Sequence, residues 1–399
     1  MLAFGNGRSY GDVCLNGGGT LLATKALDRF IEFDTESGSL ECEAGLLLSD
    51  IIKITLPHGW FPPVTPGTAL VSVGGAIAND VHGKNHHRAG SFGHHLCSFE
   101  LRRSSGEVLR CSPQSNADWF YATIGGLGLT GLITTARLQL RRVPGAWIEG
   151  GSQRFANLEE FFALAAQADA SHEYTVAWLD CAATAGKLGR GVFMHGDHSA
   201  RSRPVPQERP LRFPITPPVS PVGPHSVRLF NELYYRRTAA QQSDALWYFR
   251  PFLYPLDSIL EWNRLYGPQG FFQYQCVLPP NDAPASLRDM LQLIAASGQG
   301  SFLAVLKCFG ERASLGWLSF PRPGVTLSLD FPNRGAGTLR LLESLDDITR
   351  AARGAVYPAK DARMSAEAFR EYFPRWTQLQ PYVDPQFSSS FWRRVTETH

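Results

Sequence analysis

The stretch VSVGGAIANDVHGKNHHRAGSFGHH spans residues 71–95 and decides how this chain folds. Its paired glycines, followed by small apolar residues, let backbone amides approach a large anionic ligand, because no Cβ atom stands in the way. Five of the chain's 11 histidines lie here, so a metal site is the competing interpretation. His82 and His86 have the i, i+4 spacing of a helical zinc pair, but no Cys, Asp or Glu ligand follows at the usual spacing. The stretch therefore favours a cofactor cradle, and we expect no metal.

A second glycine-rich stretch, GNGRSYGD at residues 5–12, follows the apolar residues 2–4. A phosphate-binding loop often follows a strand in this way. Tyr10 stands where the Rossmann fingerprint needs its third glycine, and the Gly-Lys-Ser/Thr of a P-loop is missing. Alone, this stretch is weak evidence, since turn or bulge glycines would give the same pattern.

Both stretches, taken with GGLGLTG at residues 125–131, resemble FAD-linked oxidases of the vanillyl-alcohol oxidase and p-cresol methylhydroxylase type. Three downstream segments are similar, more narrowly, to the decaprenylphosphoryl-β-D-ribose 2'-oxidase family, the flavin half of a two-enzyme epimerase. These segments are LYPLDSILEWNRLYGPQGFFQYQ (residues 253–275), SFLAVLKCFG (residues 301–310) and YPAKDAR (residues 357–363). The resemblance covers essentially the whole chain and rests on long, specific motifs.

The resemblance implies an α+β fold: a two-domain flavoprotein of the FAD-binding PCMH type, with a cofactor domain and an antiparallel-sheet substrate domain. We expect an FAD-binding domain over residues 1–142, a substrate domain over residues 143–335, and a C-terminal segment, residues 336–399, that returns to the cofactor domain. Residues 199–224 hold eight of the 27 prolines and are predicted to form a mobile surface loop. Family members have several tens of residues before the first glycine loop, so we expect the first domain to lack an N-terminal segment and Met1 to be an internal methionine.

Composition narrows the classes of protein that fit. At 399 residues, the chain is long enough for two or three domains, each with its own core. A net charge of +2 is far from the strong positive charge that is typical of nucleic-acid-binding proteins, so we expect no nucleic-acid partner. The seven cysteines form no CxxC pair and are odd in number, which favours reduced thiols in a cytoplasmic setting. No apolar run reaches the roughly 18 residues that a spanning helix needs.

Hydrophobic periodicity predicts the main helices and strands. In the first domain we expect strands at residues 21–24, 30–33, 40–43 and 135–141, a hairpin of residues 99–103 with 108–111, and helices at residues 47–56 and 118–124. In the substrate domain we expect strands at residues 174–180, 271–278, 302–309 and 325–331, and helices at residues 285–296 and 338–350.

Residues 227–237, VRLFNELYYRR, form a segment that is amphipathic, aromatic and basic at once. A helix packed on its own core and a lid that touches lipid explain this pattern equally well. The second interpretation would place the protein peripherally at the inner membrane.

The cofactor residues follow from the resemblance. It implies FAD held without a covalent bond, with His82 as a contact and the backbone amides of Gly5–Gly11 and Val73–Gly75 at the pyrophosphate and ribityl groups. The full set of expected cofactor contacts is Gly5, Asn6, Gly7, Arg8, Ser9, Tyr10, Gly11, Asp12, Gly67, Val73, Gly74, Gly75, Asn79, His82, Ile133 and Tyr357.

The substrate residues are predicted partly from strand alternation. Side chains two apart on a strand share one face, so Gln273 projects with Gln275, and Thr326 with Ser328 and Asp330. A polar face within an apolar sequence is either solvated surface or the wall of a site. The resemblance implies a substrate pocket lined by Lys84, Trp178, Tyr254, Gln273, Gln275, Lys307, Ser328 and Lys360, with Lys360, Lys307 and Gln275 as catalytic residues.

The implied reaction is oxidation of the 2'-hydroxyl of a polyprenylphosphoryl-ribose to the 2'-keto sugar, the first half of epimerisation to an arabinose donor. A short-chain reductase would take the keto product. Lys360 would polarise the hydroxyl or stabilise negative charge on the reduced flavin, and the second role needs no shift of its pKa. Family members often carry Cys where this chain has Ser328, which concerns specificity rather than flavin chemistry.

Two other interpretations remain open. An aldonolactone or alditol oxidase would use the same cofactor fold on a free polyol or sugar lactone. Outside the enzymes, a degenerate flavoprotein would only bind a partner, although the intact glycine stretches at residues 5–12 and 71–95 speak against it.

Overall fold

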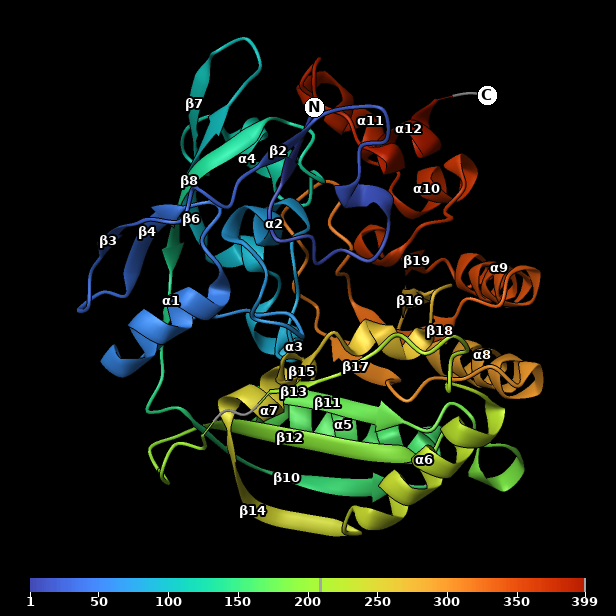
Figure 1. Ribbon diagram of the computed structural model, residues 1–399. Helices are drawn as coiled ribbons and strands as arrows, with labels where there is room; N and C mark the ends of the chain where they lie inside the picture. The colour runs from blue at the N-terminus through green and yellow to red at the C-terminus, as the bar shows by residue number, and fades with distance from the viewer. Residues whose placement is uncertain (208–209, 398–399) are drawn as a thin grey trace. The chain divides into compact units, whose positions relative to one another are not determined.

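The computed structural model describes residues 1–207 and 210–397 (Figure 1). The chain divides into two compact units, each made of separate stretches of sequence. Unit 1 comprises residues 1–146, 312–322 and 361–399, and unit 2 comprises residues 147–311 and 323–360.

This division differs from the expected one in two places. Residues 336–360, expected to return to the cofactor domain, belong to unit 2, because β19 (Ala355–Val356) pairs with a strand of that unit's sheet. Residues 312–322 leave the expected substrate domain for unit 1, where the Ser319 hydroxyl donates to the buried carboxylate of Asp80 at 2.6 Å. Residues 361–399 belong to unit 1.

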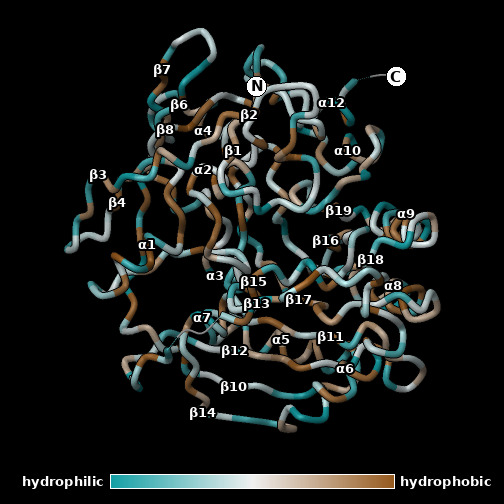
Figure 2. Tube along the Cα trace, viewed as in Figure 1, coloured by the Kyte–Doolittle hydropathy of each residue, from teal (hydrophilic) through white to brown (hydrophobic). Residues whose placement is uncertain are grey.

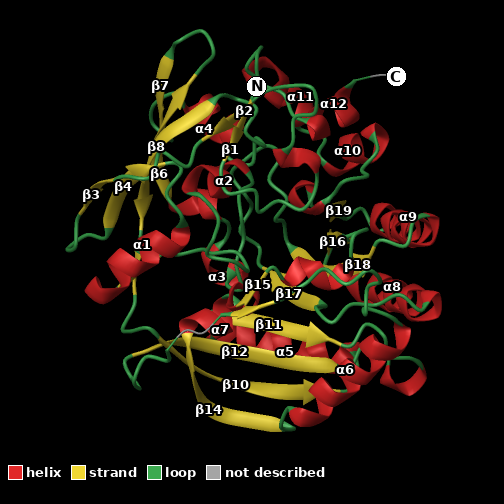
Figure 3. Cartoon of the chain, viewed as in Figure 1, coloured by secondary structure: helices red, strands yellow, loops and turns green. Residues whose placement is uncertain are grey.

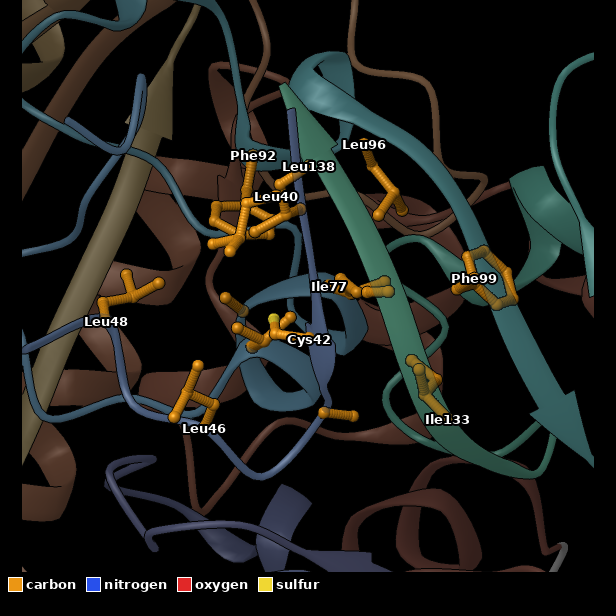
Figure 4. Packing of buried hydrophobic residues seen from close by; sticks show 14 of the residues in the cluster. Leu40, Cys42, Leu46, Leu48, Ile77, Phe92, Leu96, Phe99, Ile133 and Leu138 are labelled. Atoms are coloured by element: carbon orange, nitrogen blue, oxygen red, sulfur yellow. The ribbon is translucent and has the colours of Figure 1, made fainter. Parts of the chain in front are cut away.

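Unit 1 is built on an antiparallel five-stranded sheet in the order β3-β4-β8-β6-β7. Figure 4 shows how Leu40 and Cys42 of β4, Ile77 of α2, and Ile133 and Leu138 of β8 lie in one buried cluster. The sheet strands are β3 (Phe30–Phe33), β4 (Ser39–Glu43), β6 (Leu96–Arg102), β7 (Val108–Cys111) and β8 (Leu132–Gln139).

Shorter elements surround this sheet. The predicted strand before the first glycine loop is β1 (Leu2–Phe4), which pairs in parallel with β2 (Leu21–Ala23) and buries Leu2. The other elements of unit 1 are α1 (Leu48–Thr55), α2 (Val73–Ala78), α3 (His86–Ala89), α4 (Ala117–Thr123), α10 (Ala366–Tyr372), α11 (Trp376–Leu379), α12 (Ser390–Thr396), β5 (Trp60–Phe61) and β9 (Arg141–Arg142).

Unit 2 is built on an antiparallel eight-stranded sheet in the order β14-β10-β12-β11-β17-β18-β16-β19. Figure 3 shows these strands with helices beside them. Helix α8 (Ala283–Ser297) packs against α5 (Leu158–Ser171) and α9 (Ala336–Ala351), and α5 and α9 pack on the sheet. The strands are β10 (Trp147–Phe155), β11 (Tyr174–Leu179), β12 (Gly191–Ser199), β14 (Gln241–Tyr248), β16 (Phe271–Leu278), β17 (Val305–Phe309), β18 (Gly324–Pro332) and β19.

The remaining elements of unit 2 are helices and one small sheet. The helices are α5 (Leu158–Ser171), α6 (Pro224–Arg237), α7 (Phe249–Leu253), α8 (Ala283–Ser297) and α9 (Ala336–Ala351), and β13 (Leu211–Arg212) pairs with β15 (Ile259–Leu260). No helix in the described part of the chain is both long and apolar enough to cross a bilayer.

Most predicted elements are confirmed, and the strand over residues 271–278 has the predicted bounds. Three long strands, β10, β12 and β14, were not predicted from the sequence, and neither were the two-residue strands β5, β13, β15 and β19. Gly150 and Gly151 interrupt β10, and β12 carries His195, Asp197 and His198, so neither has the local signature of a strand. Their ladders with each other and with neighbouring strands hold them in place.

The proline-rich segment, residues 199–224, is largely irregular, as predicted. Ser199 ends β12 and Pro224 begins α6; between them, in the described part, the only strand is the short β13, and residues 208–209 lie outside the described residues. The predicted helix over residues 227–237 is confirmed as part of α6.

Candidate active site

One face of the unit 2 sheet carries the polar side chains that the sequence predicted. The strand register places Gln275 opposite Ser328 and Gln273 opposite Asp330. On the other side of β18, Lys307 lies opposite Thr326. Directly paired residues of antiparallel strands project to the same face, so β16, β17 and β18 together form one polar wall.

Two hydrogen bonds join strands within this wall. The Gln273 side chain donates to the Asp330 carboxylate at 2.6 Å, and the Gln275 side chain donates to the Thr326 hydroxyl at 3.1 Å. Asp330, Thr326 and Gln275 are nearly inaccessible to solvent. A buried polar group without a partner is costly, so these bonds fix the orientation of each amide.

Two backbone hydrogen bonds position Lys360 next to the polar wall. The Tyr357 amide donates to the Gln275 carbonyl at 2.9 Å, and the Lys360 amide donates to the Tyr357 carbonyl at 3.0 Å. The turn after β19 is therefore tied to the strand that carries Gln275. Tyr357, expected at the cofactor, is buried in unit 2.

The two lysines of the site titrate well below the usual range. Burial lowers the pKa of Lys307 to about 8. Burial also lowers the pKa of Lys360 to about 8; the Asp330 carboxylate opposes this shift, and the charge of Lys307 adds to it. Burial raises the pKa of Asp330 to about 6, against the hydrogen bond from Gln273 and the charge of Lys360. Ionisable groups perturbed in this way are typical of active sites.

Asp330 is the residue that the predicted site lacked. The sequence placed it on the polar face with Ser328 and Thr326, but its carboxylate type gave no reason to include it in a site for an anionic substrate. Only the fold brings it close enough to Lys360 for each charge to shift the other's pKa.

The other expected substrate residues, Trp178, Tyr254 and Lys84, lie in different parts of the structure. Trp178 lies opposite Val305 in the sheet register, on the face that carries Lys307, and its indole donates to the Phe302 carbonyl at 2.9 Å. Tyr254 is buried at the end of α7. Lys84 belongs to unit 1, between α2 and α3, and is partly exposed.

In unit 1 the two glycine-rich stretches meet. The Asn6 side chain donates to the Leu70 carbonyl at 2.7 Å. A Cβ on Gly5 would lie 2.2 Å from the Ser72 hydroxyl oxygen, so glycine lets the loop approach Ser72 without displacing its side chain. Two stretches more than 60 residues apart in sequence at these contacts therefore lie against each other in unit 1.

The amides of the two stretches differ in availability. Among the described residues, the backbone amides of residues 5–9 donate to no protein acceptor. By contrast, Val73 donates to Leu46, Gly74 to Ala44, and Gly75 to the Ser72 hydroxyl. The expectation that the amides of residues 73–75 hold a pyrophosphate is therefore not supported, because these amides already bond the protein. The loop at residues 5–9 remains the candidate.

The end of the first loop is braced by the C-terminal part of unit 1. A Cβ on Gly11 would lie 1.5 Å from the Asp361 carbonyl oxygen, so the two backbones touch. The Arg394 guanidinium binds both Asp12 carboxylate oxygens, at 3.0 and 2.7 Å, and reaches Asp361 at 3.3 Å. Asp12, expected at the cofactor, thus has its carboxylate engaged in positioning the loop. Nothing in the local sequence around residue 12 pointed to Arg394.

The remaining expected cofactor residues lie in unit 1 in several settings. The Asn79 side chain donates to the Gly75 carbonyl at 2.9 Å, and the His82 ring lies 5.7 Å from that of Phe320. Gly67 has open space where a Cβ would sit. Ile133 packs in the core, so its side chain faces other apolar groups (Figure 4). Tyr10, Arg8 and Gly7 are exposed on the first loop, and Ser9 is partly exposed.

Comparison with known proteins agrees with this arrangement. The FAD binding domain family matches residues 1–112. Decaprenylphosphoryl-beta-D-ribose oxidase of Mycolicibacterium smegmatis is 38% identical over 99% of this chain and 89% of its own length. The chain belongs to this family of FAD-dependent oxidases.

Other relatives extend the similarity to different degrees. An uncharacterised protein of Streptomyces coelicolor is 35% identical over 88% of this chain and all of its own length. Cytokinin dehydrogenase 2 of Arabidopsis thaliana is 32% identical over 36% of this chain and 28% of its own length. The similarity to the plant enzyme is thus confined to about a third of the chain.

As an FAD-dependent oxidoreductase, the protein needs a cradle for an anionic dinucleotide, and unit 1 fits that need. In the described part of the chain the amides of residues 5–9 donate to no protein acceptor, and a side chain at Gly5 would collide with Ser72. Arg8 adds an exposed cation on the same loop. Open amides with a nearby cation suit a pyrophosphate.

Proposed function

We propose that this protein uses FAD to oxidise the 2'-hydroxyl of a polyprenylphosphoryl-ribose to the 2'-keto sugar. The observation that carries this proposal is the polar wall of unit 2, where Lys307 and Lys360 lie with Gln275 on the scaffold of a family whose Mycolicibacterium member is named for this substrate. When bound, FAD supplies the acceptor for the hydride that leaves C2'.

Each polar residue of the wall has its own role in this proposal. Burial lowers the pKa of Lys307, with no carboxylate offsetting the shift, so an anionic substrate phosphate would raise this pKa again and hold the lysine in its charged form. Lys360, whose charged form Asp330 favours, would stabilise negative charge on the reduced flavin, and the hydroxyl proton is lost to solvent. Gln275, held by Thr326, orients the sugar.

The cofactor is held without a covalent bond in this proposal. The His82 ring is buried against Phe320, and it acts as a contact rather than an attachment point. The loop at residues 5–9 holds the pyrophosphate. Denaturation of the yellow protein should release all flavin into the supernatant, whereas colour that stays with the precipitated chain would show a covalent link.

Two partners follow from the proposed chemistry. A 2'-keto sugar must be reduced from the opposite face to complete an epimerisation, which is the task of a short-chain reductase. The polyprenyl chain of the substrate resides in a membrane, so the enzyme must work at a membrane surface.

The test is anaerobic reduction of the bound flavin by defined substrates. Farnesylphosphoryl-ribose, which keeps the phosphate and a short prenyl chain, should bleach the flavin absorbance within the turnover time. Arabinono-1,4-lactone and free polyols should not. Bleaching by the lactone and not by the prenyl phosphosugar would replace the proposal with an aldonolactone oxidase.

A further inference from the structure

Helix α6 of unit 2 presents an apolar ridge to solvent. Leu229 is 62% exposed, Leu233 is 58% exposed and Phe230 is 44% exposed. Leu229 and Leu233 lie about one turn apart on the same side of the helix. The hydropathy colouring of α6 alternates along its length (Figure 2). Isolated exposed leucines are common, but a continuous ridge on one helix marks a contact surface.

The opposite side of α6 is anchored by a buried polar network. Asn231 is fully buried and donates to the Asp180 carboxylate at 2.9 Å. Arg190 bridges Asp180 at 2.7 Å and Glu232 at 2.6 Å. Val227 adds an apolar contact beside them. The helix is therefore fixed by its inner face, and its outer leucines do not contribute to the core.

The charges of α6 indicate what the ridge would touch. Arg228, Arg236 and Arg237 are exposed on the helix, and Glu232 is its one acidic residue, so the formal charge is three minus one, or +2. Glu232 pairs with Arg190 at 2.6 Å and with Arg236 at 2.5 Å, so Arg228 and Arg237 carry the excess positive charge of the helix. An apolar ridge flanked by arginines is the pattern of a helix that lies in the interface of an anionic bilayer.

The flank of α6 also touches the proposed substrate wall. The Tyr234 ring lies 4.6 Å from that of Trp178, and the Phe230 ring lies 4.9 Å from that of Phe302. Trp178 in turn donates to the Phe302 carbonyl. The same helix that exposes Leu229 and Leu233 therefore packs on a residue of the proposed site.

We propose that the outer ridge of α6 docks this enzyme on anionic phospholipid and so delivers the prenyl chain of the substrate toward Trp178. The proposal rests on the proposed function, because a membrane-resident substrate is what makes such docking useful. Its chemistry commits it to a lipid surface, with Leu229 and Leu233 inserted and the arginines at the phosphate level. A second copy of the chain on the same ridge is the competing occupant.

The experiment measures co-sedimentation of the FAD-loaded enzyme with vesicles. Vesicles of phosphatidylglycerol and phosphatidylcholine should bind the wild type, and binding should weaken in high salt, because exposed charges are screened. The double variant Leu229→Ser, Leu233→Ser should lose about tenfold or more in binding. Ile31→Ser, which removes an exposed apolar residue of unit 1, is the matched control and should bind as wild type.

Activity measured in parallel separates this proposal from the proposed function. With substrate dispersed in detergent, the double variant should turn over as fast as wild type, and with substrate in vesicles it should be slower. Equal vesicle binding by wild type and double variant would overturn the docking proposal. A dimer of the wild type that the double variant loses, without vesicle binding, would assign the ridge to a second copy instead. Failure of the wild type to oxidise detergent-dispersed substrate would overturn the proposed function alone.

Discussion

The two faces of the unit 2 sheet are made by the same strands but differ in role: one packs in the core and the other carries the candidate site. On one face Tyr274 of β16 hydrogen-bonds Thr349 of α9 at 2.8 Å, and Leu329 of β18 is fully buried opposite it. On the other face the same two strands carry Gln273 and Asp330. Since successive side chains alternate, one strand can supply both core and site. The comparison indicates that substitutions one residue apart should separate stability from catalysis.

The largest effect is expected on the core face. Leu329→Ala should lower the free energy of unfolding by about 2–5 kcal/mol, because it removes buried methyl groups and leaves a cavity. Urea unfolding of the FAD-loaded enzyme measures this loss. Turnover per folded molecule should stay close to that of wild type. A specific loss of turnover with unchanged stability would show that the two faces are not functionally separate.

On the site face, Lys360→Met should leave stability and bound FAD nearly intact and reduce turnover about a hundredfold, as for loss of a preorganised charge. Steady-state kinetics with flavin content measured for each preparation checks this. Lys53→Met, at an exposed position on α1, is the control and should have no measurable effect. A Lys360→Met enzyme that turns over normally would remove Lys360 from the proposed mechanism.

The pH dependence of turnover should sharpen the role of Lys360. Lys360 is protonated below its pKa of about 8, so a role as a cation predicts that turnover falls as pH rises through about 8. Asp330 ionises above about 6, so turnover should rise through that pH. Because Lys360 and Asp330 interact, the two apparent pKa values of the pH profile belong to the pair and not to either residue alone.

Asp330→Asn tests this reading of the profile. The variant loses the carboxylate that opposes the lowering of the Lys360 pKa, so the alkaline limb should move to lower pH and the acidic limb should disappear. Turnover that instead rises through about 8 in the wild type would show that neutral Lys360 acts as a base.

The smallest effect on turnover is expected for Ser328→Cys, which compares a thiol on the site face with the native Cys276 on the core face. Cys276 is buried, and burial raises the pKa of its thiol to about 12, so it should resist electrophiles. The new thiol, on the partly exposed position 328, should be labelled irreversibly by a nitroaromatic electrophile. Peptide mapping of the labelled protein distinguishes the two. Labelling of Cys276 rather than position 328 would place Ser328 away from the site.

Local pattern was sufficient for much of this molecule. Strand alternation alone put Gln273 with Gln275, and Ser328 with Thr326, on one face, and the registers agree. Periodicity also located most helices, because an apolar stripe at helical spacing is written in consecutive residues. The two glycine-rich stretches indicated the family, since glycine is the residue that close approach of the backbone to a ligand requires.

Other features depended on contacts between residues far apart in sequence. The strands β10, β12 and β14 form through their ladders, because strand formation depends on neighbours more than on local propensity. Glycine content could not reveal that the Val73 and Gly74 amides donate to the carbonyls of Leu46 and Ala44, or that the Gly75 amide donates to the Ser72 hydroxyl.

Charge showed the same division between sequence and structure. The sequence by itself determined that Lys307, Lys360 and Asp330 are present, and that α6 is amphipathic and basic. Only the tertiary structure decided that burial lowers both lysine pKa values to about 8, that Asp330 opposes this at Lys360, and that the leucines of α6 face outward. The physical reason is that solvation and Coulomb energies depend on distance and burial in space, which sequence neighbours do not set.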